Sequence, residues 1–255
     1  LDIKNKDILY APRTISAIIP AAGSDPEFDL PKALLKISDR TLLERQHELL
    51  SRAGITDINC VVGFKREMVK VDGVHYHVND EFAETGILHS LFKAREKMEN
   101  GFLYLNSDIV FNSDVLNTVI NADGDIVLCV DNSYAYHKHQ IDKELDLVIS
   151  RSRPETGPRH RSFYLNRGEV VRIGKKVNKE NADYEFTGIA KFSEKGADIL
   201  IKVYNDLLQH SSDKPLHEAL SIRTAGLTDL LQEVISRGIS VEFVNVYKGW
   251  IEIHD

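Results

Sequence analysis

Residues 15–23 read Ile15-Ser16-Ala17-Ile18-Ile19-Pro20-Ala21-Ala22-Gly23, an apolar run that ends in three small residues. Branched apolar residues are typical of a buried strand, and small residues after it let a backbone approach a ligand closely. Similar runs at 57–62, 102–105 and 125–130 alternate with segments of helical period. This alternation predicts an α/β fold, with a doubly wound, mostly parallel, mixed sheet and helices on both faces.

Further elements extend the pattern to both ends of the chain. A helix over 41–53 opens with a capping box, Thr41 with Glu44, and closes at Gly54. We expect further helices at 86–98, 114–121 (capped by Asp114), 193–208 and 224–237, and further strands at 74–79, 169–173, 184–192, 239–246 and 250–253. Residues 131–168 lack periodicity and are predicted to be an irregular insertion that shapes part of a substrate site. One domain over 1–255 is therefore predicted.

Composition excludes several classes of protein. With 42% hydrophobic residues in 255, the chain can bury a sizeable core, which excludes intrinsic disorder as its main state. A net charge of -7 gives no basic field for binding a nucleic-acid backbone. The apolar runs fall short of the roughly 20 residues of a membrane-spanning helix. Cys60 and Cys129 lie in apolar runs and are predicted to be buried free thiols, which favours a cytoplasmic location.

The loop after the first strand, residues 20–32, is a candidate phosphate site. Ligands of such sheets bind beyond the carboxyl ends of the strands. Consecutive peptide N–H groups of small residues can hold an anion, and Lys32 adds a positive charge behind Pro31. Neither a Walker sequence nor GxGxxG is present. A flexible loop with a solvated lysine is an equally good interpretation of this loop taken alone.

Asp108 directly follows the central apolar strand at 102–105. A carboxylate there suits Mg²⁺, which takes one or two carboxylates together with phosphate oxygens. The alternative is that Asp108 caps the next helix, but Asp114 is available for that role. Near the end of the chain, Glu252 shares a strand face with Trp250 and Asp255 lies past the strand. The sequence does not choose between Glu252 and Asp255 as a partner of Asp108.

Several motifs together resemble those of nucleotidyltransferases of the nucleotide-diphospho-sugar transferase type. They are Ile18-Ile19-Pro20-Ala21-Ala22-Gly23, Pro31-Lys32-Ala33-Leu34-Leu35, Gly63-Phe64-Lys65, Asn79-Asp80-Glu81-Phe82, Thr85-Gly86-Ile87-Leu88-His89-Ser90-Leu91, Asn106-Ser107-Asp108, Glu185-Phe186-Thr187-Gly188-Ile189 and Trp250-Ile251-Glu252-Ile253-His254-Asp255. The sequence is most similar to cytidylyltransferases acting on phosphocholine or small phosphonates such as 2-aminoethylphosphonate. Some of those are fused to a phosphoenolpyruvate mutase, and the chain is expected to be a piece of such a fusion.

The resemblance implies roles for particular residues. Lys32 and Asp108 would be catalytic, and Mg²⁺ would be held by Asp108 with Glu252 or Asp255. Contacts to CTP would come from Ala21, Ala22, Gly23, Ser24, Lys32, Asp80, Ser90 and Asn106. Two departures stand out: an acidic stretch, Asp25, Glu27 and Asp29, replaces the usual loop arginine, and a His-Asp pair follows the last strand.

The acceptor needs its own contacts. The basic stretch from Arg151 to Arg167, with Arg172, Lys175 and Lys176, is the local basic cluster of an acidic chain, and arginine binds phosphate or phosphonate in bidentate fashion. An acceptor ammonium group would instead need carboxylates or aromatic faces. The predicted acceptor residues are Arg153, Arg161, Lys176, Glu185, Thr187 and Tyr136.

We therefore expect a Mg²⁺-dependent cytidylyltransferase that transfers CMP from CTP to a small phosphonate or a phosphocholine-like acceptor and releases pyrophosphate, as in phosphonate biosynthesis. Its expected partners are the nucleotide and the acceptor, without nucleic acid or membrane. One alternative is a sugar-1-phosphate nucleotidyltransferase. Another is a regulatory nucleotide-binding module without turnover.

Overall fold

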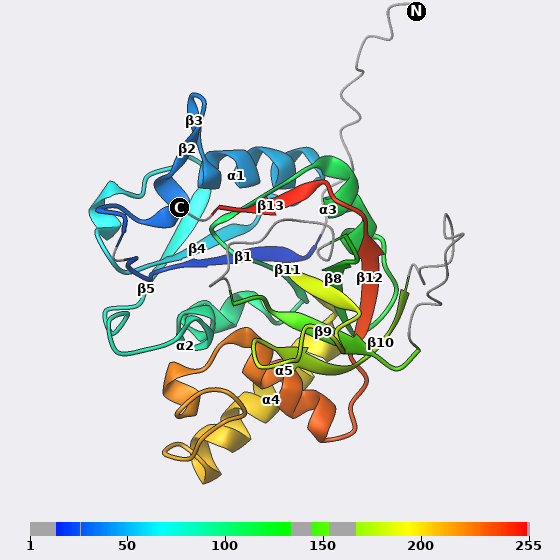
Figure 1. Ribbon diagram of the computed structural model, residues 1–255. Helices are drawn as coiled ribbons and strands as arrows, with labels where there is room; N and C mark the ends of the chain where they lie inside the picture. Colours follow the sequence, from blue (N-terminus) through cyan, green and yellow to red (C-terminus); the bar gives the residue numbers. More distant parts are fainter. Residues whose placement is uncertain (1–13, 26, 134–143, 153–166, 254–255) are drawn as a thin grey trace, which may run out of the picture.

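A computed structural model of the protein describes residues 14–25, 27–133, 144–152 and 167–253. Its centre is a nine-stranded sheet (Figure 1). The strands are β1 (Ser16–Ala21), β4 (Ile58–Val62), β5 (Val74–Val78), β6 (Phe102–Leu105), β8 (Ile126–Asp131), β9 (Leu147–Ser150), β10 (Arg167–Gly174), β11 (Tyr184–Phe192) and β12 (Glu242–Val246). Their order across the sheet is β5-β4-β1-β6-β11-β8-β12-β10-β9.

The pairing of these strands confirms the predicted mixed α/β class. Strands β5, β4, β1 and β6 pair in parallel, and so do β8 and β12. Strand β11 runs antiparallel to both β6 and β8 and so joins the two parallel parts. The carboxyl ends of β1 and β6 therefore lie next to each other, which brings the loops after these two strands together.

Helices cover both faces of the sheet (Figure 1). On one face lie α1 (Leu42–Arg52) and α3 (Ser113–Ile120), and on the other α2 (Ile87–Phe92), α4 (Glu194–His210) and α5 (Leu227–Ser236). Each helical layer buries its own apolar cluster against the strands. Four short 3-10 helices, at Lys32–Leu34, Arg66–Met68, Arg95–Lys97 and Ile222–Thr224, complete the helical elements of the described residues.

Two small ribbons lie outside the main sheet. One is formed by β2 (Lys36–Ile37) and β3 (Arg40–Thr41). The other pairs β7 (Ile109–Phe111) with β13 (Trp250–Glu252), and it carries the end of the chain back across the molecule (Figure 1). Strand β7 could not be predicted from the sequence, because a three-residue strand leaves little periodicity. This ribbon has a direct effect on the site, since β7 follows Asp108.

The helix boundaries confirm one cap and correct another. Thr41 Oγ1 accepts the backbone N–H of Glu44, and the Glu44 carboxylate accepts the N–H of Thr41, as the capping box predicts. Asp114 is not the cap of α3. Asn112 takes that role, because β7 moves the helix start to Ser113, and its side chain accepts the N–H of Val115.

The predicted helix 86–98 is wrong in its second half. The α-helix stops at Phe92, and a 3-10 turn at Arg95–Lys97 follows. Leu91, Ala94 and Met98 are all fully buried. The tighter turn keeps these three side chains on the core side, so tertiary packing decides the backbone here.

The expected irregular insertion at 131–168 contains a regular strand. β9 lies within it and pairs with β10 and β11. Leu147 and Val148 are buried. Four residues within a polar stretch give too short a pattern for prediction. Residues 134–143 and 153–166 of this segment lie outside the described part of the chain.

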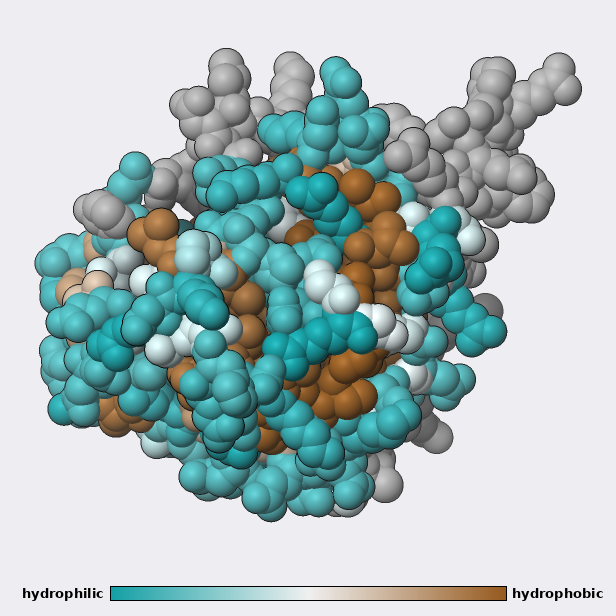
Figure 2. Space-filling view, turned by 90° about the horizontal axis from the view of Figure 1, so that it is seen from below, coloured by the Kyte–Doolittle hydropathy of each residue, from teal (hydrophilic) through white to brown (hydrophobic). Residues whose placement is uncertain are grey.

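The surface is mainly hydrophilic on the side of α2, α4 and α5, with apolar side chains visible in patches between polar ones (Figure 2). Within the described residues, every helix is too short or too polar to cross a bilayer. Both cysteines are buried and free, as the sequence predicted.

Candidate active site

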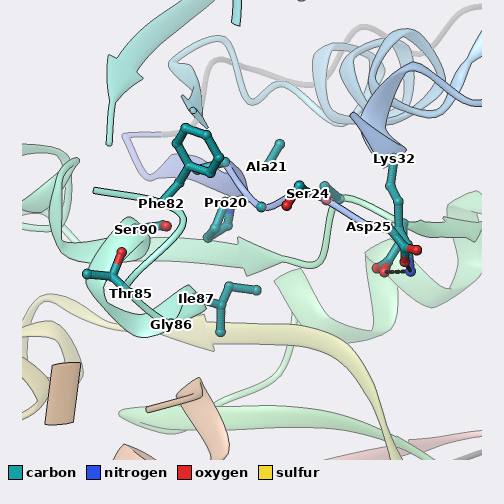
Figure 3. A pocket seen from close by; sticks show the side chains of 14 residues that line it. Pro20, Ala21, Ser24, Asp25, Lys32, Phe82, Thr85, Gly86, Ile87 and Ser90 are labelled. Carbon is teal, nitrogen blue, oxygen red and sulfur yellow. Dashed lines mark ion pairs between the residues drawn. The ribbon is translucent and has the colours of Figure 1, made fainter. Parts of the chain in front are cut away.

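A cavity of about 220 Å³ opens at the carboxyl ends of β1 and β6 (Figure 3). The loop after β1 forms one wall, the start of α2 forms another, and the turn after β6 completes it. The lining residues are Pro20, Ala21, Ala22, Gly23, Ser24, Asp25, Lys32, Phe82, Thr85, Gly86, Ile87, Ser90, Ser107 and Asp108. The predicted residues of the first loop, Lys32, Ser90 and Asp108 thus share one cavity.

The loop after β1 is held close to its neighbour and open toward the cavity. The Ala22 carbonyl accepts the N–H of Phe64, and a Cβ at Gly63 would lie 2.7 Å from that carbonyl oxygen, so glycine permits this approach. A Cβ on Gly23 would meet no atom within 4 Å. The backbone at Gly23 is therefore accessible to a ligand in the cavity.

Lys32 lies between two carboxylates. Its Nζ is 2.9 Å from Asp25 Oδ2 and 3.7 Å from Asp108 Oδ2. Desolvation of the ammonium lowers the pKa of Lys32, but the hydrogen bond to Asp25 and the charges of Asp108, Asp25 and Glu252 outweigh it, so the pKa is raised. Lys32 is therefore a fixed positive charge at neutral pH, as binding a triphosphate requires.

The ribbon of β7 and β13 brings the chain at Glu252 next to Asp108. Glu252 is paired with Ile109 in register, and the N–H of Ile253 donates to the Asp108 carbonyl at 2.8 Å. The charges of Asp108 and Glu252 both raise the pKa of Lys32. Glu252 is not among the residues that line the cavity, so it lies behind Asp108 rather than in the cavity wall. Asp255 lies outside the described residues.

The donor chemistry of this pair fits Mg²⁺. Asp108 and Glu252 offer hard carboxylate oxygens, and Mg²⁺ commonly binds one or two carboxylates plus substrate phosphates. Among the described residues, no group of three or more His, Cys, Asp or Glu side chains forms a complete metal site. A two-carboxylate site that needs the triphosphate to complete it agrees with both facts.

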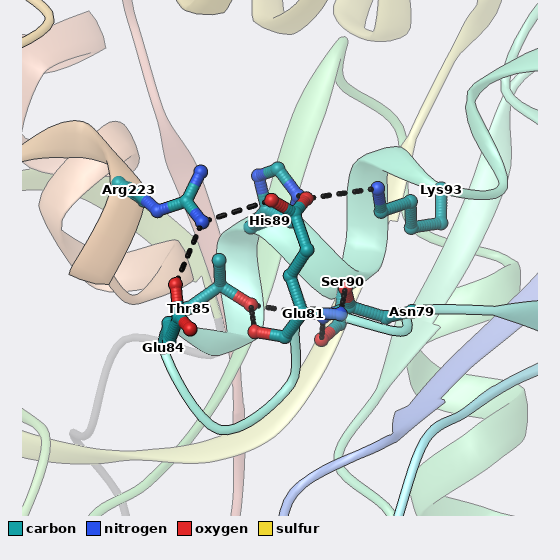
Figure 4. A network of polar contacts seen from close by, with 8 residues as sticks. All are labelled: Asn79, Glu81, Glu84, Thr85, His89, Ser90, Lys93 and Arg223. Carbon is teal, nitrogen blue, oxygen red and sulfur yellow. Dashed lines mark hydrogen bonds and ion pairs between the residues drawn. The ribbon is translucent and has the colours of Figure 1, made fainter.

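A polar network supports the wall made by α2 (Figure 4). Buried Asn79 donates to the hydroxyls of Thr85 and Ser90, each at 3.0 Å. Glu81 contacts Arg223, His89 and Lys93. The Arg223 hydrogen bond and charge lower the pKa of Glu81 to about 2, with His89 and Lys93 adding to the effect. This network fixes Thr85 and Ser90 at the cavity wall.

Two predicted nucleotide contacts lie elsewhere. Asp80 is outside the cavity lining, and its exposed carboxylate pairs with Arg66 at 2.5 Å. Asn106 also lies outside the lining. Its side chain accepts the Tyr104 hydroxyl at 2.5 Å, its N–H donates to the Gly188 carbonyl, and its own carbonyl accepts from Gln46. Asn106 thus holds the turn that presents Ser107 and Asp108, a supporting position rather than a place at the cavity wall.

The predicted acceptor residues divide into three groups. Glu185 and Thr187 are buried in β11, and Thr187 Oγ1 donates to the Cys129 carbonyl at 3.1 Å. Lys176 does not line the first cavity; it lines a second one beside α5, where its N–H donates to Glu218. Tyr136, Arg153 and Arg161 lie outside the described residues.

Sequence reasoning missed Asp146, a partly buried carboxylate just before β9. Thr228 at the start of α5 lies 3.4 Å from its Oδ1. The charges of Asp108, Asp146 and Glu252 all raise the pKa of Tyr104, after the larger effect of its burial. An aspartate between Leu145 and Leu147 was the signal that could have revealed this carboxylate.

Comparison with known proteins assigns the chain to a family. Residues 17–167 match the MobA-like NTP transferase domain, and the chain belongs to that family. It is 23% identical over 94% of its length to the CTP:phosphoglutamine cytidylyltransferase of Campylobacter jejuni, 95% of which is covered. It is 30% identical over 39% of its length to the choline-phosphate cytidylyltransferase of Streptococcus pneumoniae, 47% of which is covered.

Solved structures agree on the fold. The inositol-1-phosphate CTP transferase of T. maritima superposes with a TM-score of 0.66 at 19% identity, with 96% of this chain and 91% of that chain covered. The CTP:phosphocholine cytidylyltransferase of Streptococcus pneumoniae gives 0.63 at 18% identity, with coverage of 94% and 93%. The protein is an enzyme, a nucleotidyltransferase, and the predicted nucleotide-diphospho-sugar transferase type of sheet is confirmed. The alternative of a module without turnover is accordingly dropped.

Proposed function

We propose that the protein transfers CMP from CTP to a small acceptor that carries a phosphate or phosphonate group. The observation that carries this proposal is the convergence of Lys32 and Asp108 at the cavity behind the Ala22-Gly23-Ser24 loop, with β13 bringing the chain at Glu252 next to Asp108. The names of three of the similar proteins specify CTP, which supports cytosine as the base.

The chemistry is a displacement at the α-phosphorus of CTP. An acceptor oxygen forms the new bond to this phosphorus, the bond to the bridging oxygen of the β-phosphate breaks, and pyrophosphate leaves with that electron pair. Phosphate and phosphonate oxygens are ionised at neutral pH, so a general base is not required. The protein contributes positioning and charge neutralisation, which dominate catalysis of phosphoryl transfer.

Each group has a distinct task in this scheme. Peptide groups near Gly23 and the Lys32 ammonium bind triphosphate oxygens. Asp108 and Glu252 would hold Mg²⁺, which when bound would neutralise charge on the triphosphate. Thr85 and Ser90 lie on the opposite wall, where they can contact the rest of the nucleotide.

The acceptor is proposed from the relatives. Three of them act on compounds that combine a phosphorus group with a nitrogen group: phosphoglutamine, choline phosphate and, in Streptomyces rubellomurinus, an aminopropylphosphonate. We propose that Asp146 and buried Glu185 supply carboxylates to a cationic or amide group of the acceptor. A role in phosphonate biosynthesis, a fusion partner and a single domain over 1–255 stay predictions.

A pyrophosphate-release assay tests the proposal. CTP, UTP, ATP and GTP are each offered with phosphocholine, 2-aminoethylphosphonate, a phosphorylated glutamine and glucose 1-phosphate, with Mg²⁺ or with a chelator. We expect Mg²⁺-dependent turnover with CTP and one of the nitrogen-bearing acceptors. Turnover with the sugar phosphate alone would instead make the enzyme a sugar-1-phosphate nucleotidyltransferase.

A further inference from the structure

Asp131, the last residue of β8, is a buried carboxylate outside the cavity. It is 2% exposed and accepts hydrogen bonds from four donors. Two belong to Ser133, the N–H at 2.7 Å and the hydroxyl at 2.8 Å. The other two come from the far end of the chain: the Trp250 indole N–H at 2.8 Å and the Lys248 N–H at 3.4 Å. A buried carboxylate requires such donors, so its neighbours are constrained to supply them.

These bonds fix the turn through which the chain leaves the main sheet. Strand β12 ends at Val246, which is paired in register with Asp131. The chain then turns with φ of 63° at Lys248 and 85° at Gly249. The Gly249 carbonyl accepts the N–H of Asn112 at 2.9 Å. The turn is thus tied to β8 on one side and to the start of α3 on the other.

The turn leads directly into β13, which carries Glu252. Trp250 and Glu252 are two residues apart and share a strand face, while Ile251 between them is 57% exposed. Trp250 is paired with Phe111 and Glu252 with Ile109. Slippage by one residue would turn Glu252 to the outer face. The indole bond to Asp131 opposes that slippage.

We infer that Asp131 is a positioning residue, which acts through Trp250 to hold β13 in the register that places Glu252 next to Asp108. This inference rests on the proposed role of Glu252 as a metal ligand. Groups that orient metal ligands typically change metal affinity by about 10- to 100-fold when they are removed. Asp131 differs from such groups in acting along a strand rather than on the ligand itself.

The test compares Trp250→Phe and Asp131→Asn with the wild type. Phenylalanine keeps an apolar ring against the core and removes the indole donor. Mn²⁺ binding is measured calorimetrically in the presence of CTP and without acceptor, and turnover is measured as a function of Mg²⁺ concentration. We expect about 10-fold weaker Mn²⁺ binding in both variants. The Mg²⁺ concentration that gives half-maximal turnover should rise by the same factor in both variants, and kcat should be largely recovered at saturating Mg²⁺.

Ser133→Ala is the matched control, because it removes one donor to the same carboxylate and leaves the Trp250 donor of β13 in place. Its Mn²⁺ affinity should equal that of the wild type, and circular dichroism should show all variants folded. Wild-type Mn²⁺ affinity in Trp250→Phe, or an equal loss in Ser133→Ala, would overturn the inference. Glu252→Gln separates the two proposals: if it keeps full Mn²⁺ affinity, Glu252 is no ligand and the proposed metal site fails with it.

Discussion

The Lys32 ammonium lies 3.7 Å from the Asp108 carboxylate, although the two residues follow different strands of the sheet. Strands β1 and β6 are parallel neighbours, so their carboxyl ends place both side chains at one cavity. A cation for triphosphate oxygens and an anion for a metal are therefore held within reach of the same nucleotide.

Replacement of Asp108 by Asn should remove most activity and leave the fold intact. The neutral amide keeps the shape but loses the charge that would hold Mg²⁺, so we expect kcat/KM to fall by about 100-fold or more. Pyrophosphate release measures the loss. Asp114→Asn is the control, because Asp114 is exposed on α3 and is not one of the residues that line the cavity. Equal activity in the two variants would remove Asp108 from the mechanism.

Lys32→Met should weaken the binding of CTP. The variant loses the positive charge but keeps a flexible apolar stem, so we expect KM for CTP to rise about 10-fold or more with a fall in kcat. Lys36→Met, four residues on and exposed in β2, should behave like the wild type. Unchanged KM in Lys32→Met would contradict the assignment.

Asp25→Asn should tighten CTP binding. Asp25 pairs with Lys32 at 2.9 Å, and a triphosphate competes with it for the same ammonium. A partly exposed pair contributes about 0.5–1 kcal/mol, so KM should fall by about two- to fivefold. Initial rates at low CTP measure this. A large loss of activity would show that Asp25 itself takes part in catalysis.

Stability should depend on pH through Asp146. Desolvation raises its pKa to about 6; Lys175 and Thr228 oppose this, and Glu252 and Glu218 add to it. Between pH 4 and 6 the folded protein keeps a proton that the unfolded chain has lost, so the free energy of unfolding falls as pH rises through this window. The Asn side chain of Asp146→Asn cannot ionise. The free energy of unfolding of this variant should therefore exceed that of the wild type by about 1–2 kcal/mol above pH 6 and equal it below pH 4. Urea unfolding at both pH values tests this, and a pH-independent difference would refute it.

Thr41→Ala should destabilise the protein without touching the site. It removes the side-chain half of the α1 capping box, which costs about 1 kcal/mol and lowers the melting temperature by about 2–4 °C. Thr118→Ala is the control, because its hydroxyl bonds within α3 to the Asp114 carbonyl rather than to a helix end. A larger shift for Thr118→Ala would contradict the capping argument.

The sequence by itself determined the elements whose signals are local. The apolar run at 15–23 predicted the buried strand β1 and the open loop after it, and the capping box of Thr41 and Glu44 predicted the start of α1. Both predictions succeed because branched side chains and helix caps act within a few residues. Lys32 and Asp108 could be selected for the same reason, since each directly follows a recognisable feature of the chain.

Only the tertiary structure decided what depends on contacts between distant segments. It paired β13 with β7, which placed Glu252 beside Asp108, and it set Asp25 against Lys32. In the folded chain, Asp80 pairs with Arg66 outside the cavity lining. Helix α2 ends at Phe92, and Asn112 caps α3. Strands this short and charges this exposed carry almost no local preference, so packing and register across the fold determine where their side chains lie.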